Sequence, residues 1–183
     1  MRSPYMKTTH ILKALTFAIA ATLTTPAFAS SSHGYAIDYI QGEGDVKGVK
    51  LAYQYHIPQE KLPFQHARVY FESSFNIWQY GKENNHQTNL VLAMSPVIQY
   101  PIFSVKNIPV SVEFGIGVSI LDDTHFAGKN VSTHYQFEDR LGLVADLGND
   151  TSLALRYLHY SNAGFKSPNP GLDFISLSYA RRF

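Results

Sequence analysis

The sequence predicts an all-β protein, an eight-stranded antiparallel transmembrane β-barrel, and three observations lead to this fold class. Eight segments alternate apolar with polar or small residues, and each has about the 9 to 11 residues that a tilted strand needs to cross a bilayer. After residue 29, no apolar run reaches the roughly 18 residues of a membrane helix. Tyrosine and phenylalanine, twelve of each, are plentiful, as in chains with aromatic girdles at two membrane interfaces. The expected barrel is therefore of the outer-membrane type.

The first 29 residues have the features of a cleaved secretory signal. Basic residues precede an apolar segment from Ala14 to Leu23, and Ala27-Phe28-Ala29 supplies a small-residue cleavage site. We expect residues 1–29 to be removed and residues 30–183 to form a single barrel domain.

Composition excludes several classes of function. The formal net charge of +1 and the pI near 8.0 give no case for binding nucleic acid. The chain has no cysteine, so disulfides and thiol chemistry are absent. Its eight histidines are scattered without metal-ligand spacing, so neither a catalytic metal nor another cofactor is expected.

The first four strands follow from alternating stretches separated by turn-forming residues. The first covers residues 33–41 and the second covers 47–57. The third follows the segment 58–63, with its alternation running from Val69 to Ile77. The fourth covers residues 87–100, where Pro96 predicts a bulge or irregular pairing because proline cannot donate to a ladder.

The last four strands are expected over residues 109–121, 135–147, 151–162 and 172–183. The first of these is the most regular, with branched or aromatic residues at even positions and small or polar residues at odd positions. Apolar-out and polar-in alternation is typical of a membrane barrel. A soluble sandwich that buries the branched face is the alternative for this pattern, and an exported soluble β-barrel that carries an apolar ligand inside is a further alternative for the whole chain.

The even strand count places both ends of the barrel on one side, which we expect to be the periplasm. The last strand ends at Phe183, and a terminal aromatic resembles the signature by which bacterial outer-membrane barrels are recognised for assembly. Odd-numbered strands then run outwards, so the 151–162 strand finishes at the outer leaflet and the 172–183 strand begins there.

Five charged residues fall on the inward set of these strands. An eight-stranded lumen is just wide enough to be filled by side chains, so charges of both signs inside it should pair. We predict a buried ionic network from Glu72, Glu113, Glu138, Arg140 and Arg156.

His159 and Ser161 lie two residues apart in the strand 151–162 and therefore project from the same face. A serine hydroxyl becomes a nucleophile when an adjacent base takes its proton, and the base works best when a carboxylate holds its other nitrogen. Asp173 is a candidate for that carboxylate. A strand end with two polar residues is the alternative, so the wider motif decides.

The run from His159 to Gly171, HYSNAGFKSPNPG, followed by Asp173 and a terminal strand, resembles the PagL-type lipid A 3-O-deacylases of Gram-negative outer membranes. The likeness implies that His159 and Ser161 are catalytic. It also implies that Asp173 stands where the family usually has glutamate, one methylene longer. The implied protein is a serine esterase of the outer membrane.

The implied substrate is lipid A of lipopolysaccharide, among the other outer-membrane lipids, with hydrolysis of the 3-hydroxyacyl ester at position 3. All three candidates share the apolar, lipid-facing side of their strands, where a substrate too large for a filled lumen can reach them. A non-catalytic eight-stranded outer-membrane barrel, serving adhesion or membrane integrity, is the alternative function. A homodimer is left open.

Four further residues are candidates around the serine. Asn162 and Asn169, in the loop 162–171, are candidates for oxyanion or substrate contacts, with turn formation as the alternative. The strands 135–147 and 151–162 are joined by a short turn at residues 148–151, and residues paired across them must project from the same face. The numbers of two paired residues should therefore sum to 298 or 300. Phe137 then lies beside Ser161 as a candidate acyl-chain contact, and Asp139 lies beside His159 or Ser161 as a rival to Asp173.

Overall fold

The structure is a computed structural model that describes residues 32–63, 65–81 and 87–183. The predicted signal at residues 1–29 lies outside the described residues. No helix in the described part of the chain is long and apolar enough to cross a membrane.

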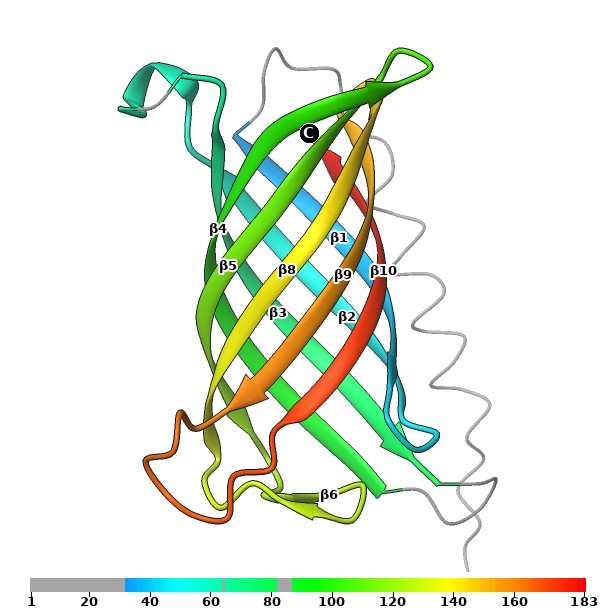
Figure 1. The fold of residues 1–183 in the computed structure, drawn as a ribbon, viewed down its shortest axis with the longest axis vertical. Coiled ribbons are helices and arrows are strands. Elements are labelled where there is room, and N and C mark those ends of the chain that lie inside the picture. Colours follow the sequence, from blue (N-terminus) through cyan, green and yellow to red (C-terminus); the bar gives the residue numbers. More distant parts are fainter. Residues whose placement is uncertain (1–31, 64, 82–86) are drawn as a thin grey trace, which may run out of the picture.

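Eight antiparallel strands close into a barrel in the order β1-β10-β9-β8-β5-β4-β3-β2, which confirms the predicted fold class (Figure 1). The barrel strands are β1 (His33–Gly42), β2 (Lys47–His56), β3 (Arg68–Tyr80), β4 (Gln87–Val105), β5 (Ile108–Leu121), β8 (Tyr135–Gly148), β9 (Thr151–Ser161) and β10 (Leu172–Arg182). A short 3-10 helix, η1 (Gln59–Lys61), follows β2, and β6 (His125–Phe126) and β7 (Lys129–Asn130) form a small hairpin between β5 and β8.

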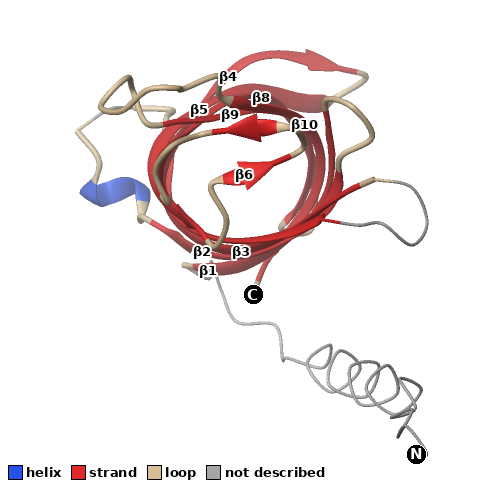
Figure 2. Ribbon diagram, turned by 90° about the horizontal axis from the view of Figure 1, so that it is seen from below, coloured by secondary structure: helices blue, strands red, loops and turns tan. Residues whose placement is uncertain are grey.

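The two ends of the barrel differ. The terminal end is the one where β1 begins and β10 finishes, with the Phe183 amide donating to the His33 carbonyl at 2.9 Å. The loop end, opposite, holds the long connection 122–134, with β6 and β7, and the connection 162–171 (Figure 1). Viewed from the loop end, the β6–β7 hairpin lies across the mouth of the barrel (Figure 2).

At Pro96 the pairing of β4 with β5 is interrupted, as expected, since neither Ser95 nor Pro96 has a partner on the described strand β5, but no bulge forms there. The register of β4 and β5 is the same on both sides of it, since Met94 faces Val118 and Val97 faces Gly115. The register shifts instead between Pro101 and Phe103, and β4 continues to Val105 rather than ending at residue 100. The ladder with β3 also runs through Pro96, which faces Phe71. One missing donor thus weakens the ladder without displacing it.

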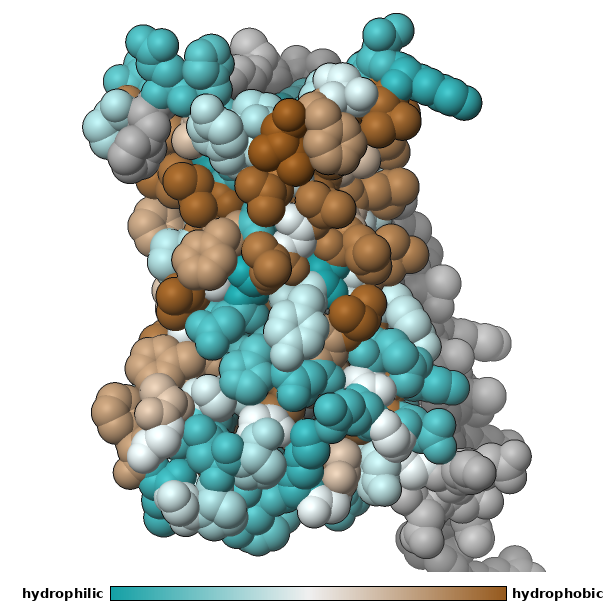
Figure 3. All heavy atoms as spheres, in the orientation of Figure 1, coloured by the Kyte–Doolittle hydropathy of each residue, from teal (hydrophilic) through white to brown (hydrophobic). Residues whose placement is uncertain are grey.

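The barrel is apolar outside and polar inside. On β5 the even-numbered side chains Phe114, Ile116 and Val118 are exposed, whereas Ser111 and Glu113 are buried. Figure 3 shows the apolar side chains of one face gathered towards the terminal end and the hydrophilic ones towards the loop end. The alternative of a soluble barrel with an apolar interior is wrong, because its alternation would be the reverse.

All five predicted charges meet in the lumen. The Arg140 Nη2 atom lies 2.9 Å from Glu138 and also bonds Glu72, while the Arg156 Nε atom lies 2.7 Å from Glu113. Two charges that were not predicted complete the network: Lys50, 2.9 Å from Glu72, and Asp38, 2.9 Å from Arg156. These side chains are at most 2% exposed, so the network fills the lumen.

Between this network and the loop end, aromatic side chains close the lumen. The Trp78 ring lies 4.5 Å from the Phe174 ring and 4.8 Å from the Tyr160 ring, measured between centroids. Phe126, from β6, packs on the same cluster and is 1% exposed. The β6–β7 hairpin is thus part of the core and not a free loop.

Candidate active site

Strand alternation turns the candidate residues onto the outer wall. On β9, Leu158 and Tyr160 are fully buried towards the lumen, so the alternating residues His159 and Ser161 project outwards. On β10, Leu172 and Phe174 are buried, so Asp173 projects outwards as well. All three lie at the loop end of the barrel (Figure 1).

Strand pairing brings His159 and Asp173 together. The two residues are direct partners across β9 and β10, and His159 Nδ1 lies 2.7 Å from Asp173 Oδ1. Directly opposed residues in an antiparallel pair have Cα atoms only about 4.5 to 5.5 Å apart. The shorter aspartate therefore reaches the imidazole without adjustment. Because Nδ1 is engaged, Nε2 is the ring nitrogen that remains for Ser161, two positions along the same face.

Tyr157, for which the sequence predicted no role, also holds the aspartate. Its hydroxyl donates to Asp173 Oδ1 at 2.5 Å, so one carboxylate oxygen accepts from both Tyr157 and His159. The available signal was that Tyr157 lies two residues before His159 on the same face. The two bonds restrict the aspartate to the position that orients the imidazole.

Asp139 occupies the place that strand parity predicted. It faces His159 across β8 and β9, and Phe137 faces Ser161, both with residue numbers that sum to 298. The predicted register is confirmed. In the described part of the chain, however, no hydrogen bond joins Asp139 to His159, whose Nδ1 is bonded to Asp173. The geometry thus favours Asp173 over its rival as the orienting acid.

The two asparagines lie in the loop 162–171, and each has a structural bond. Asn162 is 1% exposed, and its amide nitrogen donates to the carbonyls of Val131 at 3.0 Å and Lys166 at 2.9 Å. Its side chain therefore has no hydrogen left for an oxyanion. The side-chain oxygen of Asn169 accepts from the Asn162 backbone N–H at 3.2 Å. This bond does not use the side-chain amide nitrogen of Asn169.

Phe137 lies in a row of aromatic side chains beside Ser161. Its ring centroid is 5.2 Å from that of Tyr135 and 6.2 Å from that of Phe165. Phe165 is 78% exposed, as a loop residue that extends from the wall. This row provides an apolar surface next to the serine, as a lipid-binding site requires, and the role of Phe137 itself stays a prediction.

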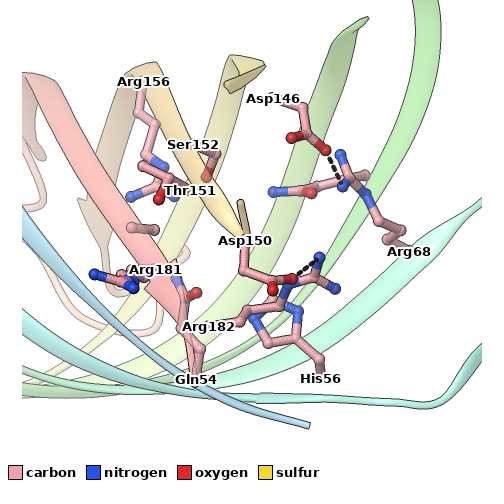
Figure 4. A pocket seen from close by; sticks show the side chains of 12 residues that line it. Gln54, His56, Arg68, Asp146, Asp150, Thr151, Ser152, Arg156, Arg181 and Arg182 are labelled. Atoms are coloured by element: carbon pink, nitrogen blue, oxygen red, sulfur yellow. Dashed lines mark hydrogen bonds and ion pairs between the residues drawn. The ribbon is translucent and has the colours of Figure 1, made fainter. Parts of the chain in front are cut away.

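A separate polar pocket opens at the terminal end of the barrel (Figure 4). Ser161 lies at the opposite, loop end, where β9 finishes. Two of the pocket's arginines form ion pairs, with Arg68 2.9 Å from Asp146 and Arg182 2.7 Å from Asp150. None of the candidate residues lines it. Among the described residues, no group of three or more histidine or carboxylate side chains could hold a metal ion.

The fold and the site together define a class: a transmembrane barrel of the outer-membrane type with a serine and a histidine–carboxylate pair on its lipid-facing wall. The family profile described as lipid A 3-O-deacylase (PagL) matches residues 47–182. The chain belongs to this family, and it is an outer-membrane protein.

Two curated relatives support the assignment over part of their length. The chain is 44% identical over 72 residues to the lipid A deacylase PagL of Bordetella bronchiseptica, covering 39% of this chain and 40% of that protein. It is 36% identical over 110 residues to the lipid A deacylase PagL of Pseudomonas aeruginosa, covering 60% of this chain and 62% of that protein. The matches thus span less than two thirds of either relative.

Solved structures agree with the fold. The crystal structure of the outer membrane enzyme PagL superposes with a TM-score of 0.65 at 25% identity, covering 82% of this chain and 99% of that one. A de novo designed transmembrane β-barrel superposes with a TM-score of 0.54 at 9% identity, covering 86% and 100% of the two chains. The second likeness concerns the fold alone.

Proposed function

We propose that this protein is a lipid A 3-O-deacylase, which hydrolyses the ester that links a 3-hydroxyacyl chain to position 3 of lipid A. Membership of the family supports the reaction and the substrate. The observation that carries the proposal is the His159–Asp173 pair, 2.7 Å apart on the lipid-facing wall, on the same face as Ser161. An ionisable pair facing lipid needs a functional reason, because such groups are costly there.

The position of the pair suits a lipid substrate. The lumen is filled by the ionic network and closed by the aromatic cluster, so a molecule with several acyl chains has no path inside. On the outer wall the same molecule approaches by lateral movement in the outer leaflet. The aromatic row of Tyr135, Phe137 and Phe165 then offers apolar surface for an acyl chain.

The chemistry is acyl transfer in two steps. The Ser161 hydroxyl attacks the ester carbonyl, and His159 Nε2 takes its proton. The tetrahedral intermediate expels the sugar oxygen, which receives that proton from His159. Water then attacks the acyl-enzyme with His159 again as base, releasing the 3-hydroxy fatty acid and restoring the serine. Asp173 keeps Nδ1 protonated and stabilises the imidazolium.

The oxyanion requires donors from the loop 162–171. The Asn162 side chain is excluded because its amide nitrogen already donates to two carbonyls, that of Lys166 within the loop and that of Val131 in the connection between β5 and β8. The Asn169 amide and the backbone N–H of Ala163, two residues after Ser161, are the donors we assign. Asn162 then acts by holding this loop, with its side-chain oxygen accepting from the Gly164 amide at 3.0 Å.

Mass spectrometry of lipid A from cells that express the chain tests the function. The proposal predicts the loss of one 3-hydroxyacyl group, and no loss with Ser161→Ala at equal barrel abundance in the membrane. An unchanged lipid A spectrum with a correctly inserted parent barrel, together with no hydrolysis of purified lipopolysaccharide, would favour the non-catalytic alternative.

A further inference from the structure

The connection between β5 and β8 forms a cap over the loop end of the barrel. We define the cap as residues 122–134, which include the β6–β7 hairpin (Figure 2). Two of its side chains, Phe126 and Val131, are each 1% exposed and pack in the core cluster with Trp78 and Tyr160. These two side chains therefore anchor the cap in the lumen. Polar groups of the cap form hydrogen bonds with neighbouring loops.

The cap binds the loop that joins the two catalytic strands. Three side-chain hydrogen bonds connect them: Asn162 Nδ2 to the Val131 carbonyl at 3.0 Å, Ser132 Oγ to the Pro168 carbonyl at 2.7 Å, and Lys129 Nζ to the Gly171 carbonyl at 3.1 Å. They meet the loop at its start, its middle and its end. The cap therefore holds the whole connection between Ser161 and Asp173.

Lys129 makes the contact nearest to the catalytic histidine. A Cβ atom on Gly171 would lie 2.6 Å from Cε1 of His159, so the glycine backbone packs directly against the imidazole. Gly171 has a φ of +70°, a conformation that glycine adopts without cost. Its carbonyl accepts from Lys129 Nζ, which also lies 2.6 Å from Glu43 in the turn between β1 and β2. The ammonium thus joins two loops across the active-site edge of the barrel.

We propose that Lys129 is a positioning residue for the deacylation reaction. By holding the Gly171 carbonyl, it fixes the backbone wall against which the His159 ring rests, and it fixes the start of β10 that carries Asp173. This inference rests on the proposed function. In this role Lys129 acts through Gly171 and not on the substrate, since its ammonium donates to the Gly171 carbonyl and to Glu43.

A substrate contact would give a different result. Lysines at the loop end of such a barrel lie near the phosphates of lipopolysaccharide, and a lysine that binds them contributes mainly to substrate affinity. A positioning residue contributes to the rate of the bound complex instead. The two roles therefore differ in whether KM or kcat changes when the ammonium is removed.

The test compares Lys129→Met with the parent in detergent micelles that contain purified lipopolysaccharide. We expect kcat to fall by about 10- to 100-fold, as for a displaced catalytic group, with little change in KM. Lys129→Arg, which can still donate to both partners, should retain most of the rate. Lys47→Met, which removes one exposed charge at the same end of the barrel, should match the parent.

Three outcomes would overturn the proposal: an unchanged kcat in Lys129→Met, a rise in KM with kcat unchanged, or an Arg variant as slow as the Met variant. Heat-modifiable mobility in detergent gels verifies that each variant is folded. If the parent itself does not hydrolyse lipopolysaccharide, the proposed function fails and not this inference. The NMR signals of the His159 ring then provide the test, since they should shift in Lys129→Met and not in Lys47→Met.

Discussion

On strand β9, Arg156 and His159 are three residues apart and meet acids in different ways. Arg156 faces the lumen between two carboxylates, Glu113 at 2.7 Å and Asp38 at 2.9 Å, and its side chain is 2% exposed. His159 faces the outer wall, meets the single carboxylate of Asp173 at 2.7 Å, and is 33% exposed. One strand thus carries a structural ion pair on one face and the proposed catalytic pair on the other.

The difference shows what each environment permits. In the lumen, each charge is surrounded by partners and excluded from water, so breaking one pair leaves a buried charge at high cost. On the wall, the imidazole keeps one nitrogen for the serine, and the site is open to a lipid from the side. Substitutions on the two faces should therefore separate catalysis from stability.

The largest expected effect is on the wall. Ser161→Ala and His159→Asn should each lower kcat by roughly four to six orders of magnitude, because each removes a member of a unit that works together. Both variants should still fold and insert, since neither side chain packs in the lumen. Release of 3-hydroxy fatty acid measures the first point and heat-modifiable mobility the second. A Ser161→Ala enzyme within tenfold of the parent would remove the serine mechanism.

Substitution of the orienting acid, Asp173, should have the second largest effect. Asp173→Asn should cut the rate by about 10⁴-fold, as when a triad loses its orienting charge, and Asp173→Glu should remain active. Asp139→Asn is the matched control, because Asp139 flanks the same histidine from the other strand. If Asp139→Asn is severe and Asp173→Asn is nearly silent, the orienting acid is Asp139.

In the lumen, the effect should appear in stability and not in turnover. Glu72→Gln leaves Lys50 and Arg140 without one of their partners. The free energy of unfolding should fall by about 3 to 5 kcal/mol, as for a broken buried ion pair. Urea unfolding in lipid vesicles measures this fall. A lower kcat per folded molecule at unchanged stability would contradict the separation of the two faces.

The smallest expected effect is that of Phe137. Phe137→Ala should reduce kcat/KM by about tenfold or less, because it removes part of an apolar contact, and it should alter the preference for acyl-chain length. Phe114→Ala, on the lipid-facing side of β5, is the control, with both rates measured on lipid A of defined chain lengths. Unchanged rate and preference would leave Phe137 as a girdle aromatic.

Strand parity predicted much of the site, because a strand has a period of two. It placed His159, Ser161 and Asp173 on one face and gave the register that sets Phe137 beside Ser161. It did not reveal the bond from Tyr157 to Asp173, which depends on side-chain conformation. Asn162 is a candidate oxyanion donor from its position next to Ser161. The sequence does not show that its amide nitrogen is already bonded to the carbonyls of Val131 and Lys166.

The cap was not predicted either. Strands of two residues, such as β6 and β7, are too short to show a period, and the 122–134 segment is recognisable only as a loop in the sequence. Its contacts to Gly171 and Pro168 join residues about 40 positions apart, so no local pattern records them. The sequence therefore predicted the fold more completely than it predicted the cap contacts that hold the candidate active site.

The central claim, that the wall of the barrel carries an activated serine, is tested most directly by covalent labelling with a fluorophosphonate. The reagent reacts with a serine whose hydroxyl is deprotonated by a neighbouring base, and fluoride leaves as the phosphonate ester forms. Peptide mass spectrometry of the labelled barrel should show one modified serine, Ser161, and the modification should disappear in His159→Asn. An active enzyme without label on Ser161, or equal labelling of Ser161 in the absence of His159, would contradict the account.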